Sequence, residues 1–236
     1  ISMCEGLTIA NPKGGENLPG VAESWQISED GKTYTFFLNK AAKWSNGDQV
    51  VAEDFVWSWK RILTPSLGSQ YPDMLYYLEG AADFHQSKIS DFSLVGVKAV
   101  NDHELEVKLK NPTPFFIKLL SHYSTYPVHK KTVLQHGTID DRNGQWTRPG
   151  NFVCNGPMNL KTWELNKQII VEKNPMYWDA QNVRLNQIIY YPVSNESTED
   201  RMFRAGQLHV TNVVPLEKCP VYIETNNPNL KIEPYM

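Results

Sequence analysis

Val21-Ala22-Glu23-Ser24-Trp25 opens the part of the sequence that decides the fold. Two further segments follow it at close spacing, Ala42-Lys43-Trp44-Ser45-Asn46-Gly47-Asp48 and Glu53-Asp54-Phe55-Val56-Trp57-Ser58-Trp59-Lys60-Arg61. Phe55, Trp59 and Ile62 recur at helical spacing, and Pro65 ends the run. Together the segments predict extended chain, then a tight turn around Gly47, then a helix.

A hairpin is predicted between the first two of these segments. Trp25-Gln26-Ile27-Ser28 is extended in character, and so is Thr33-Tyr34-Thr35-Phe36-Phe37-Leu38. Asp30-Gly31 stands between them, and this dipeptide is a strong turn signal between aromatic and β-branched runs. We therefore expect two antiparallel strands here.

Val51 occupies the expected N-cap of the helix, three residues before Asp54. An N-cap side chain supplies an oxygen to a free backbone N–H, and valine has none. Glu53 and Asp54 still complement the positive end of the helix dipole. The sequence thus predicts a helix with an incomplete cap.

Further along, the pattern alternates between strands and short helices. Residues 66–92 look irregular or partly helical. Strands are expected over 95–100, 104–109, 163–171, 187–192 and 208–211, and helices over 115–120, 130–136 and 195–205. The strand, helix, strand order from 187 to 211 suggests a parallel crossover.

The composition is that of an ordinary soluble globular protein. The 236 residues, 27.0 kDa, are 41% hydrophobic and 21% charged, with a formal net charge of −3. Acids and bases are interspersed, which excludes the basic stripe of a nucleic-acid binder. No apolar run reaches the length of a membrane span, and Ile1-Ser2-Met3-Cys4 has no signal-peptide character. We expect a mature or trimmed start.

No metal, cofactor or catalytic residue is expected. His122, His129 and His136 are seven residues apart, but Pro127 interrupts any single helix through them. No HExxH, GxSxG or SxxK motif is present. The sequence therefore gives an enzyme little support.

Cysteine is scarce and its spacing is uninformative. Cys4, Cys154 and Cys219 are an odd number and form no CxxC pair. At least one cysteine therefore lacks an intrachain partner, and we interpret all three as small, buried or half-buried thiols. No zinc site is expected.

The aromatic content, by contrast, is high, with seven Trp and eleven Tyr. Five tryptophans lie inside expected strands, turns or helices and are assigned to packing: Trp25, Trp44, Trp57, Trp59 and Trp178. Three tyrosines in the irregular segment are better placed to bind a ligand: Tyr71, Tyr76 and Tyr77.

The three opening segments, in this order, resemble the extracytoplasmic oligopeptide-binding proteins of solute-binding protein family 5, which feed ABC importers. Lys173-Asn174-Pro175-Met176-Tyr177-Trp178 and Phe203-Arg204-Ala205-Gly206 match this family too. The resemblance runs almost from end to end. It implies an α+β (mixed α/β) fold of the periplasmic-binding-protein-like class II, peptide-binding branch, with the far lobe absent.

The resemblance also implies a domain layout. Residues 5–129 resemble the extra α+β domain of the peptide-binding branch. Residues 130–236, with 1–4, resemble the near-lobe α/β segment, which ends at the hinge strand Glu233-Pro234-Tyr235-Met236. The chain is then incomplete, and most groups that pair with peptide termini are expected outside it.

Three ligand-facing positions carry over by resemblance: Tyr71, Asn212 and Tyr235. Val213 stands where close relatives have a second Asn, which puts the peptide grip at Asn212 in question. Cys154 replaces a usual Thr, and the family's disulfide belongs to the absent lobe. The implied ligands are short peptides held extended, largely through backbone hydrogen bonds.

The resemblance implies a periplasmic or cell-surface monomer that works with the membrane permease of an ABC importer. Nucleic acid is not an expected partner. Within the family, a murein tripeptide, a nickel complex or haem is an alternative ligand. An enzyme or structural protein on the same scaffold is a further alternative, which turnover or a bound metal would favour.

Overall fold

A computed structural model describes residues 2–230 of the chain. The chain divides into two units, one of residues 1–163 and 169–189, the other of residues 164–168 and 190–236. Each unit is described by itself. The division expected at residues 129 and 130 stays a prediction, and the hinge strand lies outside the described residues.

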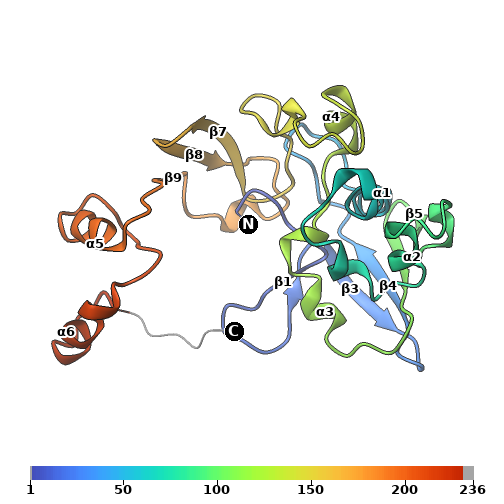
Figure 1. Cartoon of the computed structure of the whole chain (residues 1–236), viewed down its shortest axis with the longest axis horizontal. Helices are drawn as coiled ribbons and strands as arrows, with labels where there is room; N and C mark the ends of the chain where they lie inside the picture. Colours follow the sequence, from blue (N-terminus) through green and yellow to red (C-terminus); the bar gives the residue numbers. More distant parts are fainter. Residues whose placement is uncertain (1, 231–236) are drawn as a thin grey trace. The chain divides into compact units, whose positions relative to one another are not determined.

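The first unit is built on a four-stranded antiparallel sheet of order β3-β4-β6-β5. Figure 1 labels β3, β4 and β5 of this sheet. Its strands are β3 (Ala22–Ile27), β4 (Thr33–Leu38), β5 (Val97–Asn101) and β6 (Glu104–Lys108). The Asp30-Gly31 hairpin is confirmed, with Ile27 opposite Tyr34. A small two-stranded sheet, β1 (Thr8–Ile9) and β2 (Leu18–Pro19), precedes it.

The helix α1 (Ala52–Leu63) packs against β5 and carries the apolar face that its spacing predicts. Phe55, Trp59 and Leu63 are fully buried in the core with Trp44 and Phe36. All five tryptophans assigned to packing lie in or against the buried part of this unit. Five of the seven tryptophans therefore serve packing.

The short helices of this unit connect or cover the sheet. They are α2 (Ala81–His85), α3 (Phe116–Leu119) and α4 (Lys130–Gln135), with 3₁₀ turns at 65–67, 72–75, 92–94, 123–125, 145–147 and 180–182. The expected helices near 115–120 and 130–136 are confirmed.

A three-stranded sheet of order β7-β8-β9 follows: β7 (Met158–Glu164), β8 (Gln168–Lys173) and β9 (Gln187–Tyr190). The single strand expected over 163–171 is wrong. Asn166 has a left-handed backbone, with φ 57°, and turns the chain between β7 and β8. Asparagine tolerates this conformation better than most residues, so Asn166 can end one strand and start a turn.

The start of the chain is tied to residues 155–178 through Glu5. Its carboxylate accepts hydrogen bonds from Tyr177 Oη at 2.7 Å and Trp178 Nε1 at 2.8 Å. Asn155 Nδ2 donates to the Glu5 carbonyl at 2.9 Å. Burial raises the pKa of the Glu5 carboxyl although both rings donate to it.

In the second unit, α5 (Glu196–Arg204) is capped by Asn195 and followed by Gly206 at φ 73°, as expected. A 3₁₀ turn at 216–218 and α6 (Cys219–Glu224) follow. The strand expected over 208–211, and the parallel crossover with it, are wrong. Val210 is 80% exposed, and residues 208–211 pair with no strand within residues 2–230. Alternation alone cannot make a strand without a partner.

Candidate functional site

Tyr71 lies in an aromatic cluster of the first unit. It precedes Pro72 at the start of the 3₁₀ turn 72–75, which contacts the 3₁₀ turn 123–125. Its ring meets His122 edge-on at 5.3 Å and Tyr123 edge-on at 5.8 Å. His122 and Tyr123 themselves lie 4.2 Å apart between ring centroids. These three rings are called the aromatic cluster below.

The aromatic cluster is held in place by hydrogen bonds at its base. His122 Nδ1 lies 2.8 Å from Ser124 Oγ, which limits rotation of the imidazole. Tyr123 is 52% exposed, so about half of this residue is open to solvent. The hydrogen bond with Tyr71 raises the pKa of the Tyr123 phenol. The cluster therefore presents aromatic ring faces together with phenol hydroxyl groups.

Sequence reasoning missed His122 and Tyr123 as companions of Tyr71. His122 was weighed only as a metal ligand. The sequence feature that could have indicated these two residues is the polar and aromatic run Ser121-His122-Tyr123-Ser124, in an irregular stretch before Pro127. Tyr76, in contrast, packs against the core beside His85 and contributes to stability.

Asn212 belongs to the second unit and is fixed through its backbone. Glu199 Oε1, on α5, accepts a hydrogen bond from Asn212 N at 2.8 Å. The Asn212 side-chain amide has no hydrogen-bond partner in the part of the chain that the structure describes. Asn212 lines a cavity of about 670 Å³ together with Asp200 and Tyr222.

Asp200 organises the wall of this cavity. It is 4% exposed and accepts hydrogen bonds from Tyr222 Oη and from Lys218 Nζ, the latter at 2.9 Å. Arg204 Nε lies 3.0 Å from the same carboxylate. The Tyr222 hydroxyl and these two cations hold the pKa of the Asp200 carboxyl below its usual range. The charge is thus stabilised by groups of its own unit.

Tyr235, the third expected ligand position, lies outside the described residues. Tyr71 and Asn212 fall in different units, so each is described only within its own.

One cluster resembles a catalytic relay but is closed. Thr132 Oγ1 lies 2.7 Å from His129 Nδ1, and Asp48 Oδ2 lies 3.1 Å from His129 Nε2. Thr132 and His129 are 7% and 5% exposed, and the cavities of about 670 and 740 Å³ are lined by other residues. These contacts join α4 to the Asp48 turn.

Nothing in residues 2–230 gathers three His, Cys, Asp or Glu side chains as a metal ion requires. Over the same residues, no helix combines the length and apolar character of a membrane span.

The comparison with protein families decides the relationship. A family described as bacterial extracellular solute-binding proteins, family 5, middle part, matches residues 17–236. The chain belongs to this family. The mixed helix-and-sheet fold expected from the sequence is confirmed by solved structures of the same class.

Two relatives illustrate the likeness. The chain is 39% identical over 239 residues to the periplasmic oligopeptide-binding protein OppA of Escherichia coli, covering 99% of this chain and 42% of OppA. It is 34% identical to the periplasmic murein peptide-binding protein MppA of the same species, covering 90% of this chain and 38% of MppA.

The fold of the chain also matches a solved structure of a relative. Haemophilus influenzae OppA, crystallised as a complex with RPPGFSPFR, has a TM-score of 0.88 at 33% identity, covering 96% of this chain and 43% of that one. The chain therefore spans less than half the length of the relatives it matches.

Proposed function

We propose that this chain forms part of an extracytoplasmic solute-binding protein that captures extended oligopeptides and delivers them to the membrane permease of an ABC importer. The observation that carries the proposal is the 39% identity to E. coli OppA over 99% of the chain. The likeness to a peptide complex of H. influenzae OppA supports it.

The aromatic cluster is the surface in the first unit that suits such a ligand. Tyrosine and histidine rings give broad, stiff contact area without demanding one side chain, as a binder of many peptides requires. The Asn212 side-chain amide has no partner among residues 2–230 and can bond to a peptide backbone. We propose Tyr71, Asn212 and Tyr235 as ligand-facing residues, and a monomeric protein in the periplasm or at the cell surface.

Calorimetry on the full-length protein that contains this chain tests the proposal. Tyr71→Ala removes the ring that meets both His122 and Tyr123, and aromatic contacts are worth about 0.5–1.5 kcal/mol beyond their area. We expect affinity for mixed tripeptides and pentapeptides to fall by about two- to twelvefold. Leu134→Ala, at an exposed residue of α4 outside the cluster, is the control and should leave affinity unchanged. Equal affinities for both variants and the parent would overturn the role of Tyr71.

The likeness to MppA favours a murein tripeptide as the second candidate ligand. Titration with that peptide beside standard tripeptides separates the two: preference for the murein peptide by more than about tenfold, or 1.4 kcal/mol, would select it.

A further inference from the structure

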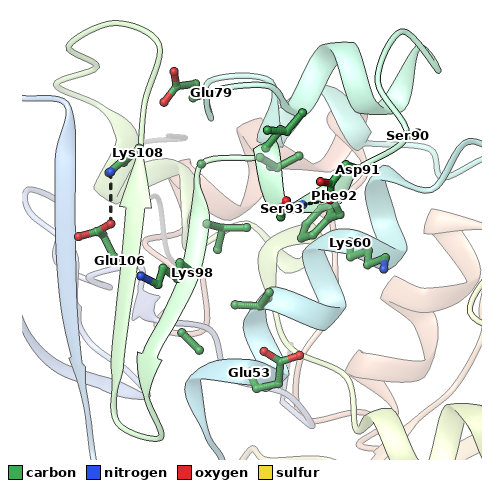
Figure 2. Close-up of a pocket in the computed structure, with 16 residues that line it drawn as sticks. Glu53, Lys60, Glu79, Ser90, Asp91, Phe92, Ser93, Lys98, Glu106 and Lys108 are labelled. Atoms are coloured by element: carbon green, nitrogen blue, oxygen red, sulfur yellow. Dashed lines mark hydrogen bonds and ion pairs between the residues drawn. The ribbon is translucent and has the colours of Figure 1, made fainter.

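A second cavity lies in the first unit, at the β5 side of the sheet (Figure 2). Its volume is about 740 Å³, within the range of small-molecule sites. It is lined by α1, by the 90–95 segment, by β5, by Glu79 and by the ion pair of Glu106 and Lys108 on β6. None of Tyr71, His122 and Tyr123 lines it. We call it the β5 groove.

The face of α1 that lines the β5 groove carries a charge at each end and an apolar residue between them. Glu53, Val56 and Lys60 follow one another at spacings of three and four, so they share a helix face. Figure 2 shows Glu53 and Lys60 on the same side of α1. Both are exposed, and neither forms a salt bridge in the described part of the chain. Seven residues of helix separate the two positions by about 10.5 Å.

The unpaired edge of β5 gives the β5 groove backbone hydrogen-bonding groups. β5 ends the sheet, and its register pairs Lys98 with Glu106. Lys108 N donates to Gly96 O, so even-numbered residues of this strand bond toward β6. In an antiparallel pair the alternate residues then point the other way. The N–H and C=O of Ala99 and the C=O of Val97 are therefore directed away from the sheet.

We propose that the β5 groove binds a free zwitterionic peptide of about three residues as a short added strand. An extended tripeptide spans about 10 Å, which matches the Glu53-to-Lys60 separation. Its ammonium group lies at Glu53 and its carboxylate at Lys60, while its backbone bonds to Ala99 and Val97. This site is separate from the aromatic cluster.

The direction of the peptide follows from the order of the elements. Lys60 Nζ lies 5.7 Å above the Phe92 ring, and the 90–95 segment leads directly into β5. The start of β5 is thus at the Lys60 end. A peptide running from Glu53 to Lys60 is antiparallel to β5, the more stable pairing.

Two features limit what fits. The Asp91 carboxylate accepts a hydrogen bond from Ser93 N at 2.9 Å. Lys60 helps to lower the pKa of Asp91, but the two form no ion pair within residues 2–230. The register of β5 shifts between Ala99 and Asn101, a bulge that interrupts strand addition at that end. A longer segment or an internal stretch of a protein would run into this bulge, whereas a tripeptide ends before it.

The test is amide NMR on the 236-residue chain, titrated with Ala-Val-Ala to about 20 mM. The expected result is saturable shifts at residues 56, 60 and 97–100 with a millimolar Kd. Glu53→Gln and Lys60→Gln should each weaken binding by about two- to fivefold, the range for exposed ion pairs. Glu29→Gln, another exposed acid of this unit, is the matched control and should have no effect.

Blocked peptides give the decisive comparison. N-acetylation should weaken binding to the parent chain by the same factor as Glu53→Gln, and should add nothing in the Glu53→Gln variant. C-terminal amidation should weaken binding to the parent chain by the same factor as Lys60→Gln, and should add nothing in the Lys60→Gln variant. Equal binding of blocked and free peptide would overturn the proposal, as would shifts confined to other surfaces. Tyr71→Ala should leave these shifts unchanged, so failure here is distinguishable from failure of the proposed function.

Discussion

Replacing Val51 with threonine should stabilise the first unit, because α1 lacks half of its cap. Val51 has the extended backbone of an N-cap residue, with φ −126° and ψ 163°, and makes no side-chain cap bond. The other half of the capping box is present. Asp54 Oδ2 accepts one hydrogen bond from Val51 N at 3.0 Å and another from Trp44 Nε1 at 3.0 Å. A threonine hydroxyl would complete the pair by accepting from Asp54 N.

The expected gain is about 0.5–1 kcal/mol, in the lower part of the usual range for caps. Two features of the structure reduce it. Asp54 N already bonds to Val51 O at 3.0 Å, so the new bond is shared. Val51 is also half-buried, and exchanging one methyl for a hydroxyl loses part of the roughly 0.8 kcal/mol of a buried carbon.

Urea unfolding followed by tryptophan fluorescence measures this change. All seven tryptophans lie in the first unit, so the signal reports on it alone. At a slope near 2 kcal/mol/M, the midpoint should rise by about 0.25–0.5 M. Val51→Ala, which removes methyl groups without adding an oxygen, should lower it. An unchanged or lower midpoint for Val51→Thr would refute the reasoning and show that Val51 acts through packing.

Three further predictions concern the carboxylate at the start of the chain, the thiols and the isolated chain. Because burial raises the folded pKa of Glu5, its protonated form is favoured by folding, and this stability is present at low pH and lost as pH rises through that pKa. Acidification from pH 7 toward 4.5 should therefore stabilise the parent relative to Glu5→Gln; parallel stability profiles would contradict this. Thiol titration should count three groups after denaturation, with Cys4 and Cys154 slow in the native protein because burial raises their pKa to about 12 and about 11; a count of one would reveal a disulfide. The 236 residues alone should bind tripeptides to pentapeptides no tighter than roughly millimolar, about −4 kcal/mol, and a micromolar affinity would be incompatible with this.

Local signals in the sequence predicted local structure well. Asp30-Gly31 specified the hairpin of β3 and β4, and the spacing from Phe55 to Leu63 specified α1. The predictions were wrong where a strand was inferred from alternating apolar and polar residues without a neighbouring strand to pair with. Asn166 breaks one expected strand with a left-handed turn, and residues 208–211 have no neighbouring strand to pair with in the described chain.

The candidate site was predictable in part. Tyr71 was found through resemblance, but its neighbours His122 and Tyr123 come from a distant part of the sequence and meet it only in the fold. The β5 groove could not be read from sequence for the same reason. Glu53 and Lys60 form an ordinary helix face until β5 is placed beside them.

Native mass spectrometry of the full-length protein that contains this chain, purified without added ligand, tests the central claim most directly. The account predicts a released mixture of short peptides with varied sequences, because stiff aromatic contacts and backbone bonding tolerate many side chains. A single non-peptide compound or a bound metal complex as the only released ligand would contradict it.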